Sequence, residues 1–268
     1  MECEILVSVM NHRNKDKIIN RLGISNDDKC LIINQIFDDK KPENDVKTGN
    51  HKFISYKEKG LSRSRNHALD NAVGDICVIA DDDMVYMDDY KKTIIDAYKK
   101  YQDADIIIFI VDREHKDYKL KIKKEGRINI LKTMKVSSVQ ITLKKFSILN
   151  KKLRFDEKFG AGSVYPWGEE NIFLFDCIKR GCKIYYVPIK IATLLDINKT
   201  SWNKDNTPEH FEKQGVIYYR MSSRLWRLLA LQFVLRKRKI YRRDMKGIDV
   251  YMAMINGVKK YKKDGQDD

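Results

Sequence analysis

The sequence has no disulfide pattern and no long apolar run, and we expect no signal peptide at its start. Its five cysteines are an odd number without paired C-x-x-C spacing, and Cys30 and Cys77 stand inside apolar segments. We therefore expect core thiols in a reducing compartment rather than disulfides or zinc ligands. Glu2 and Glu4 precede the first apolar segment, unlike the basic start of a secretory signal. No run approaches the ~20 apolar residues of a membrane-spanning helix, so the sequence predicts a cytoplasmic protein.

Acidic residues are outnumbered by basic ones. The 268 residues include 53 Lys and Arg against 38 Asp and Glu, which gives a formal net charge of +15. Such a balance favours anionic partners, whether nucleic acid, an anionic membrane face or phosphorylated substrates. Part of the charge is Lys on expected helix faces, where it serves solubility alone. The length suits one large domain, or one domain with a helical appendage.

From residue 5 to residue 188, apolar segments alternate with amphipathic ones. Continuous apolar runs separated by short helices are typical of a parallel sheet buried on both faces, so we predict an α/β fold with a Rossmann-like, mostly parallel central sheet. The segment 38–50 is expected to be a loop, Ser62 to cap its helix and Pro188 to end the last strand. Strands are expected at 5–10, 30–33, 53–56, 76–80, 105–110, 139–143 and 183–187, and helices at 15–22, 62–72, 90–101, 146–149 and 169–180.

After Asn198 the pattern changes to helix alone, which predicts a boundary between residues 1–198 and a basic helical extension, 199–268. Segment 261–268 is expected to be disordered. An apolar band in the extension lies between runs of Arg and Lys. It suits a helix lying in a membrane interface, and equally a helix that packs on the sheet domain and shows a basic outer face. The band is Trp226, Leu228, Leu229, Leu231, Phe233, Val234 and Leu235.

Three consecutive carboxylates, Asp81 to Asp83, follow the apolar run that begins at Ile76. Adjacent Asp side chains repel one another, so a bound divalent cation with oxygen ligands would account for them. An exposed acidic loop is the alternative. Ligands of open α/β sheets gather at the carboxyl ends of strands, where Asn11 and Asn34 are also expected.

A second acidic pair, Glu169 and Glu170, begins a helix behind the Gly-rich loop 159–168. The helix dipole alone would favour acids there. Tyr165 and Trp167 on the same loop would also make a sugar platform beside a general base. Arg63 and Arg65, near the start of another helix, are suited to hold a diphosphate.

These motifs, taken in order, resemble family 2 glycosyltransferases of the GT-A fold. The nucleotide-sugar half is matched by Gly60-Leu61-Ser62-Arg63-Ser64-Arg65-Asn66, then Gly74-Asp75-Ile76 and Ala80-Asp81-Asp82-Asp83. The acceptor-side motif is matched by Gly168-Glu169-Glu170 with Gly181 closing the same helix. The resemblance extends from about Glu4 to Pro188.

The resemblance implies a role for each matching residue. Asp83, with Asp81, would ligate Mn²⁺ or Mg²⁺ on the donor diphosphate. The nucleotide-sugar site would comprise Asn11, His12, Asn34, Arg65, Asp81 and Asp82. Glu170, or its neighbour Glu169, would be the catalytic base, with Tyr165 and Trp167 at the acceptor.

The sequence departs from the family pattern at three points. Asn34 stands where relatives commonly have the Asp that contacts uracil, and the base is Glu instead of the more common Asp. A third metal ligand, often His, is not evident: Asp196 stands roughly there and His210 lies farther on.

The resemblance implies an inverting, metal-dependent enzyme that moves a sugar from a nucleotide donor, UDP-linked, to a glycan acceptor. Charge and analogy favour a lipid-linked acceptor at the inner membrane face, as in capsule, O-antigen or exopolysaccharide synthesis. Two alternatives are a sugar nucleotidyltransferase and a non-enzymatic basic module that binds nucleic acid or membrane. A nucleotidyltransferase would need a Gly-rich phosphate-binding loop directly after strand 5–10, and this sequence has no glycine in that turn. A basic binding module leaves the three Asp residues unexplained.

Overall fold

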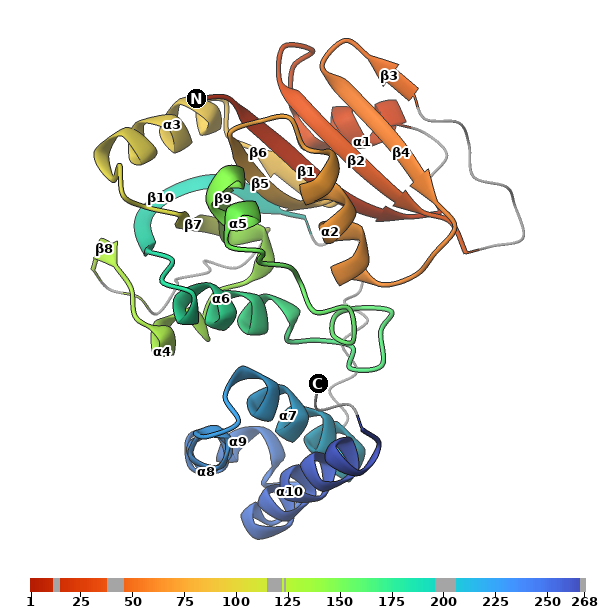
Figure 1. Ribbon diagram of the computed structural model, residues 1–268, viewed down its shortest axis with the longest axis vertical. Coiled ribbons are helices and arrows are strands. Elements are labelled where there is room, and N and C mark those ends of the chain that lie inside the picture. Colours follow the sequence, from red (N-terminus) through yellow and green to blue (C-terminus); the bar gives the residue numbers. More distant parts are fainter. Residues whose placement is uncertain (12–14, 38–45, 115–121, 123, 196–205, 266–268) are drawn as a thin grey trace. The chain divides into compact units, whose positions relative to one another are not determined.

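The computed structural model describes the chain except residues 12–14, 38–45, 115–121, 123, 196–205 and 266–268. The chain divides into two compact units, residues 1–199 and 200–268 (Figure 1). The boundary predicted after Asn198 lies outside the described residues.

The first unit is built on a single sheet, which has ten strands within the described residues. Its first half is parallel: β1 (Cys3–Met10) lies between β2 (Lys29–Gln35) and β5 (Ile76–Asp81), and β4 (His51–Tyr56) extends it beyond β2. The short β3 (Val46–Thr48) pairs antiparallel with β4. The α/β fold with a central sheet is confirmed.

The second half of the sheet is mixed. Strand β9 (Ile141–Lys144) runs antiparallel to both β5 and β7 (Ile106–Arg113). Strand β10 (Ile184–Leu194) is parallel to β7, and it pairs antiparallel with β6 (Met84–Tyr86) and with β8 (Gly126–Arg127). The sheet order is β3-β4-β2-β1-β5-β9-β7-β10-β6.

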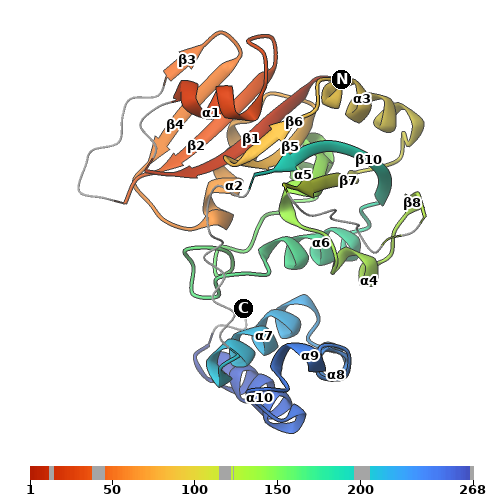
Figure 2. The ribbon, with the colours of Figure 1, turned by 180° about the vertical axis from the view of Figure 1, so that it is seen from behind.

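Apolar side chains cover both faces of the sheet, because alternate residues of each strand point to opposite sides. Val7 and Val78 belong to the core on one face, with α1 (Lys15–Leu22) and α3 (Tyr90–Lys100). Leu6 and Ile79 belong to the core on the other, with α2 (Leu61–Asn71), α5 (Lys145–Asn150) and α6 (Glu169–Lys179). Figures 1 and 2 view these two sides. This double burial explains why the strands are continuous apolar runs.

Three local expectations are wrong. The segment expected as a loop, 38–50, contains β3, which forms because β4 offers a free edge. Ser62 does not cap α2: Gly60 holds that position, and the Ser62 hydroxyl donates to the Phe159 carbonyl at 2.6 Å. Pro188 does not end β10, which continues to Leu194 past an irregularity in its register, a place where a strand tolerates proline.

Every described element of the second unit is a helix: α7 (Pro208–Met221), α8 (Trp226–Arg236), α9 (Arg238–Tyr241) and α10 (Gly247–Lys263). Helices α7 and α10 approach closely because Gly215 and Gly257 face each other's helix; a Cβ at either would collide with backbone atoms of Met254 or Glu212. The disorder expected from residue 261 is wrong as far as Lys263, since Tyr261 is buried and its ring contacts Tyr219. In the described part of the chain, no helix has the length and apolar character needed to cross a membrane.

Candidate functional site

The carboxyl ends of β1, β2 and β5 lie side by side, because Ser8 is paired with Asp81 and Val9 with Asn34. Asn34 is buried, and its side-chain amide donates to the Ser55 hydroxyl at 3.4 Å. Asn11 follows β1 with a positive φ of 51°, and its side-chain oxygen accepts from the Phe37 amide at 3.2 Å. His12, predicted to contact the nucleotide, lies outside the described residues.

The three consecutive aspartates face different surroundings. The Asp82 carboxylate and carbonyl both contact the Arg21 guanidinium, at 3.4 and 3.0 Å, which ties this residue to α1. The Asp83 carbonyl accepts from the Leu195 amide at 2.7 Å. Its Oδ1 is buried and has no hydrogen-bond partner among the described residues. Burial, followed by the charges of Asp81 and Asp82, raises the pKa of Asp83 to about 6.

Arg65, on α2, connects this acidic turn with helix α6. The side chain is almost fully buried; its Nη1 donates to Glu169 at 2.8 Å, and its Nη2 lies 3.6 Å from the Asp81 carboxylate. The guanidinium carbon stands 5.5 Å from the centre of the Phe155 ring. Nε and Nη2 have no hydrogen-bond partner within the described residues. One cation is therefore shared by two carboxylates from distant parts of the sequence.

The two glutamates at the start of α6 differ in environment. Gly168, with φ 89°, precedes them. Glu169 is buried and engaged by Arg65, whereas Glu170 is partly exposed. Burial is the largest cause, and the neighbouring Glu169 charge the second, of a rise in the pKa of Glu170 to about 8. Burial also raises the pKa of Asp81, with Arg65 opposing and Glu169 adding to the rise. A carboxyl group with a proton affinity near neutral pH is suited to accept a proton from a substrate hydroxyl.

Backbone hydrogen bonds and a ring contact connect the loop before α6 to its surroundings. The Leu61 amide at the start of α2 donates to Ala161 at 2.9 Å, and the Gly160 amide donates to Tyr165 at 2.8 Å. The Tyr165 ring stacks on Phe159 with centroids 4.9 Å apart. Tyr165 and Trp167 are both partly exposed.

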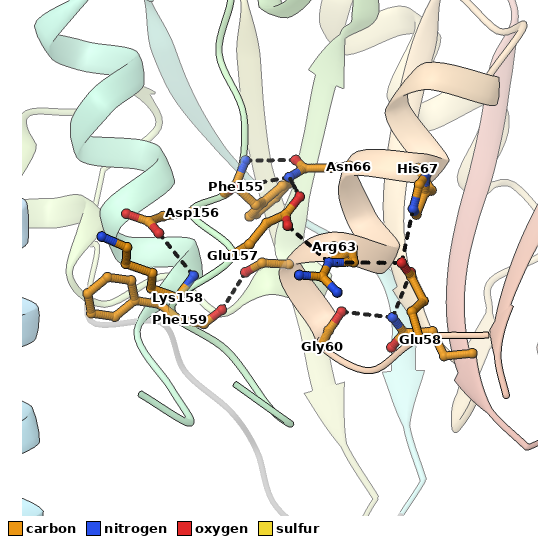
Figure 3. Close-up of polar contacts among 12 residues, drawn as sticks. Glu58, Gly60, Arg63, Asn66, His67, Phe155, Asp156, Glu157, Lys158 and Phe159 are labelled. Carbon is orange, nitrogen blue, oxygen red and sulfur yellow. Dashed lines mark hydrogen bonds and ion pairs between the residues drawn. The ribbon is translucent and has the colours of Figure 1, made fainter. Parts of the chain in front are cut away.

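A polar network joins α2 to the segment 155–159 (Figure 3). The Asn66 side chain donates to the Phe155 carbonyl and accepts from the Phe155 amide, both at 2.9 Å. Arg63 contacts Glu157 at 3.0 Å and Glu58 at 3.9 Å. Arg63 and Arg65 thus both contact carboxylates, while the Arg65 Nε has no hydrogen-bond partner within the described residues. The sequence interpretation named Asn66 only as part of a motif, and it missed Glu58 and Glu157 as partners of Arg63; Glu157 comes from a segment remote from α2.

The acidic turn, Asp81 to Asp83, offers some but not all of the ligands that a divalent cation requires. The described residues hold no group of three His, Cys, Asp or Glu side chains that could bind a metal ion. Asp83 nevertheless offers a buried carboxylate oxygen without a partner, and Asp81 lies two residues away. Mg²⁺ in nucleotide sites is commonly held by one or two carboxylates plus substrate phosphates, so this pair suits an ion that arrives with a diphosphate.

Comparison with known proteins agrees with this geometry. Residues 34–163 match the model of glycosyl transferase family 2. This segment includes Arg65 and Asp81 to Asp83 and ends before Glu169. The chain therefore carries a glycosyltransferase domain of family 2. None of the curated proteins gives a match.

Among solved structures, the chain is similar to S. aureus TarS. With TarS 1–349 in complex with UDP-GlcNAc the TM-score is 0.63 at 12% identity, covering 96% of this chain and 79% of the other. With TarS 1–349 alone the TM-score is 0.61 at 12% identity, covering 99% and 92%. With TarS 1–349 in complex with UDP it is 0.58, also at 12% identity, covering 97% and 72%. At this identity the likeness shows the fold, which is that of GT-A glycosyltransferases.

We expect Arg65→Met to destabilise the first unit by about 3–5 kcal/mol, because it leaves the buried Glu169 without its cation. The double variant Arg65→Met/Glu169→Leu should recover a large part of that loss, since it removes both charges together. Urea unfolding of the wild type, Arg65→Met, Glu169→Leu and the double variant measures the coupling. Equal destabilisation of the single and double variants would show that the pair does not govern stability.

Proposed function

We propose that this protein is an inverting glycosyltransferase that moves a sugar from a UDP-linked donor to a hydroxyl group of a glycan acceptor. The observation that carries the proposal is the arrangement around Arg65. It brings the donor-side Asp81 and the acceptor-side Glu169, neighbour of Glu170, to a single guanidinium. The family match and the UDP-GlcNAc complex of the similar TarS structure support the donor class.

The donor would lie along the carboxyl edge of the sheet. Asn11 and Asn34 stand at the ends of β1 and β2, where a nucleoside would be read, and His12 belongs to the same proposal. Arg65, Asp81 and Asp82 would border the phosphates. Asp83 and Asp81 would hold Mn²⁺ or Mg²⁺, and such an ion, when bound, neutralises the charge of the departing diphosphate.

Glu170 is the base in this proposal. Glu169 is committed to Arg65, whereas Glu170 is partly exposed and its pKa is raised to about 8. The acceptor oxygen attacks the anomeric carbon and forms the new glycosidic bond, while the bond from that carbon to the diphosphate oxygen breaks on the opposite side. The hydroxyl proton passes to Glu170, and the nucleoside diphosphate leaves. Tyr165 and Trp167 would carry the acceptor sugar.

A lipid-linked acceptor at the inner membrane face, as in capsule or other surface-polysaccharide synthesis, is supported by the second unit. Exposed leucines on α8 lie among exposed arginines: Leu228 is 63% and Leu235 70% exposed. No acidic residue occurs from 213 to 243. An apolar stripe with basic flanks suits an anionic membrane surface.

Calorimetric titration with UDP, GDP and CMP, with and without Mn²⁺, tests the donor site. We expect Mn²⁺-dependent binding of UDP and no binding of GDP or CMP. We expect Asp83→Asn to abolish both the metal dependence and sugar transfer while the protein stays folded. Asp88→Asn, which changes an exposed carboxylate just beyond β6, is the matched control. If the wild type binds none of the nucleotides, the protein is not a glycosyltransferase; binding to RNA would then favour the basic-module alternative.

Glu170→Gln should lower kcat by about 10²–10⁴-fold, the usual contribution of a positioned base, and leave UDP affinity within twofold. In the wild type, kcat should rise with pH towards about 8, where Glu170 becomes ionised.

The same substitution should stabilise the protein. The folded pKa of Glu170 lies above the model value of 4.5, so its ionisation opposes folding as pH rises from 4.5 to about 8, and not below that window. Full conversion of the shift would give about 3 kcal/mol at pH 7; because Glu170 is partly exposed we discount it, and expect a gain of about 1 kcal/mol at pH 7 and none at pH 4. Unchanged kcat in Glu170→Gln would assign the base elsewhere.

Membrane association is tested by flotation of the full chain with vesicles of anionic and of neutral phospholipid. We expect binding to anionic vesicles alone, and a loss of at least about fivefold in Leu228→Ser/Leu235→Ser, because each leucine loses its burial in the interface. Phe146→Ser, which changes an exposed apolar side chain of the first unit, is the control. Equal flotation of the double variant and the wild type would contradict the role of α8.

A further inference from the structure

A small pocket opens at the carboxyl edge of the sheet, on the opposite side of Asp81 from β1 and β2. Its cavity volume is about 40 Å³, which is room for one small substituent and not for a whole ligand. Its walls are the ends of β7 and β10 and the short 3₁₀ helix η1 (Ser138–Gln140) that precedes β9. The lining residues are Val111, Arg113, Ser137, Val139, Gln140 and Leu194.

Hydrogen-bond donors dominate the polar part of this lining. Gln140 is 1% exposed, and its side-chain oxygen accepts from the Ser137 amide at 2.9 Å. Because an amide N–H can bond only to the oxygen, the other end of the Gln140 side chain must be the NH₂ group. That nitrogen is buried without a partner among the described residues. Arg113 adds a cation, and none of the six lining residues is acidic.

An unpaired buried donor costs free energy unless something supplies an acceptor. The pocket therefore suits a group that only accepts hydrogen bonds, such as a carbonyl or a carboxylate oxygen. A hydroxyl group fits less well, because it also brings a donor into a lining that has few acceptors.

The location of the pocket suggests which ligand could reach it. Leu194 pairs with Met84, the residue after Asp83, and the Leu195 amide donates to Asp83. On the other side, Asn171 of α6 donates to the Val136 carbonyl at 3.4 Å, next to Ser137. The pocket thus lies between the aspartate turn and the start of the helix that carries Glu170. A donor with its base at β1 and β2 and its diphosphate at Asp81 to Asp83 would extend its sugar towards this pocket.

We propose that the pocket is a specificity subsite for the transferred sugar, in which Gln140 and Arg113 donate to an acetamido carbonyl or a carboxylate on the sugar ring. This rests on the proposed function, and it adds the chemical class of the sugar. Gln140 and Arg113 are specificity-determining residues here, and neither takes part in bond formation or cleavage.

The test is calorimetric titration of the full chain, in Mn²⁺, with UDP, UDP-glucose, UDP-GlcNAc and UDP-glucuronate. In the wild type, UDP-GlcNAc or UDP-glucuronate should bind about 10-fold more tightly than UDP-glucose, the effect of one well-made buried hydrogen bond. Gln140→Glu keeps the oxygen that accepts from Ser137 and removes the donor, so it should abolish this preference. For each protein, the affinity for the sugar nucleotide is divided by the affinity for UDP, and these ratios are compared, because the new charge of Gln140→Glu can also weaken the binding of UDP.

Arg113→Gln is a second variant that introduces no buried charge. It should reduce the preference for UDP-glucuronate more than that for UDP-GlcNAc, which distinguishes a carboxylate from a carbonyl ligand. Arg127→Gln removes the same charge from exposed β8 and should change neither ratio. If the wild type binds UDP and binds the three sugar nucleotides with equal affinities, the subsite proposal is overturned. A preference that persists in both pocket variants would overturn it too. Absence of UDP binding in the wild type would instead overturn the proposed function.

Discussion

The buried guanidinium of Arg65 is the constraint on which the site depends. A fully buried arginine is costly unless carboxylates surround it, and here they come from the end of β5 and the start of α6. Those two positions are 88 residues apart in the sequence (169 − 81), so the ion pairs fix the distance between the two halves of the site. The Phe155 ring beside the guanidinium and the bonds of Asn66 to the Phe155 backbone hold α2 in the orientation that makes this sharing possible.

The surrounding loop follows from the same constraint. Segment 159–168 passes close to α2, where a Cβ on Gly160 would approach both Ser62 and the Glu169 carboxyl group, and one on Gly162 would approach Lys59. These glycines therefore permit close contact between the loop, α2 and α6. The same contacts use the first amide of α2 for the Ala161 carbonyl. A helix start that looks open to an anion in the sequence is in fact closed by the protein's own backbone.

The sequence predicts the strands well because both faces of the sheet are buried, so each strand is a continuous apolar run bounded by polar turns. It also predicts which strand ends carry Asn34 and the aspartates, because parallel strands place their carboxyl ends at a common edge. It does not predict the partners of Arg63 and Arg65, since these are set by contacts between remote segments. The pairing of the short edge strand β3 is missed because β3 is exposed along its length and has no apolar pattern. The continuation of β10 past Pro188 is missed because it depends on a change of register that local propensity does not encode.

The electrostatics of the site explain why its carboxyl groups have unusual proton affinity in a protein with a net charge of +15. The excess positive charge lies elsewhere, while the edge of the sheet gathers Asp81, Asp82, Asp83, Glu169 and Glu170 around Arg65 and Arg21. Burial raises the pKa values of Asp83 and Glu170 to about 6 and about 8, and the local excess of negative charge, with two cations for five carboxylates, adds to the rise. A divalent cation beside Asp83 would lower the first value through direct attraction. Glu170, the base in the proposed function, stands next to Glu169, which Arg65 already engages, and burial together with the Glu169 charge raises its pKa. The division of labour between the two acidic motifs thus follows from which carboxylates Arg65 already neutralises.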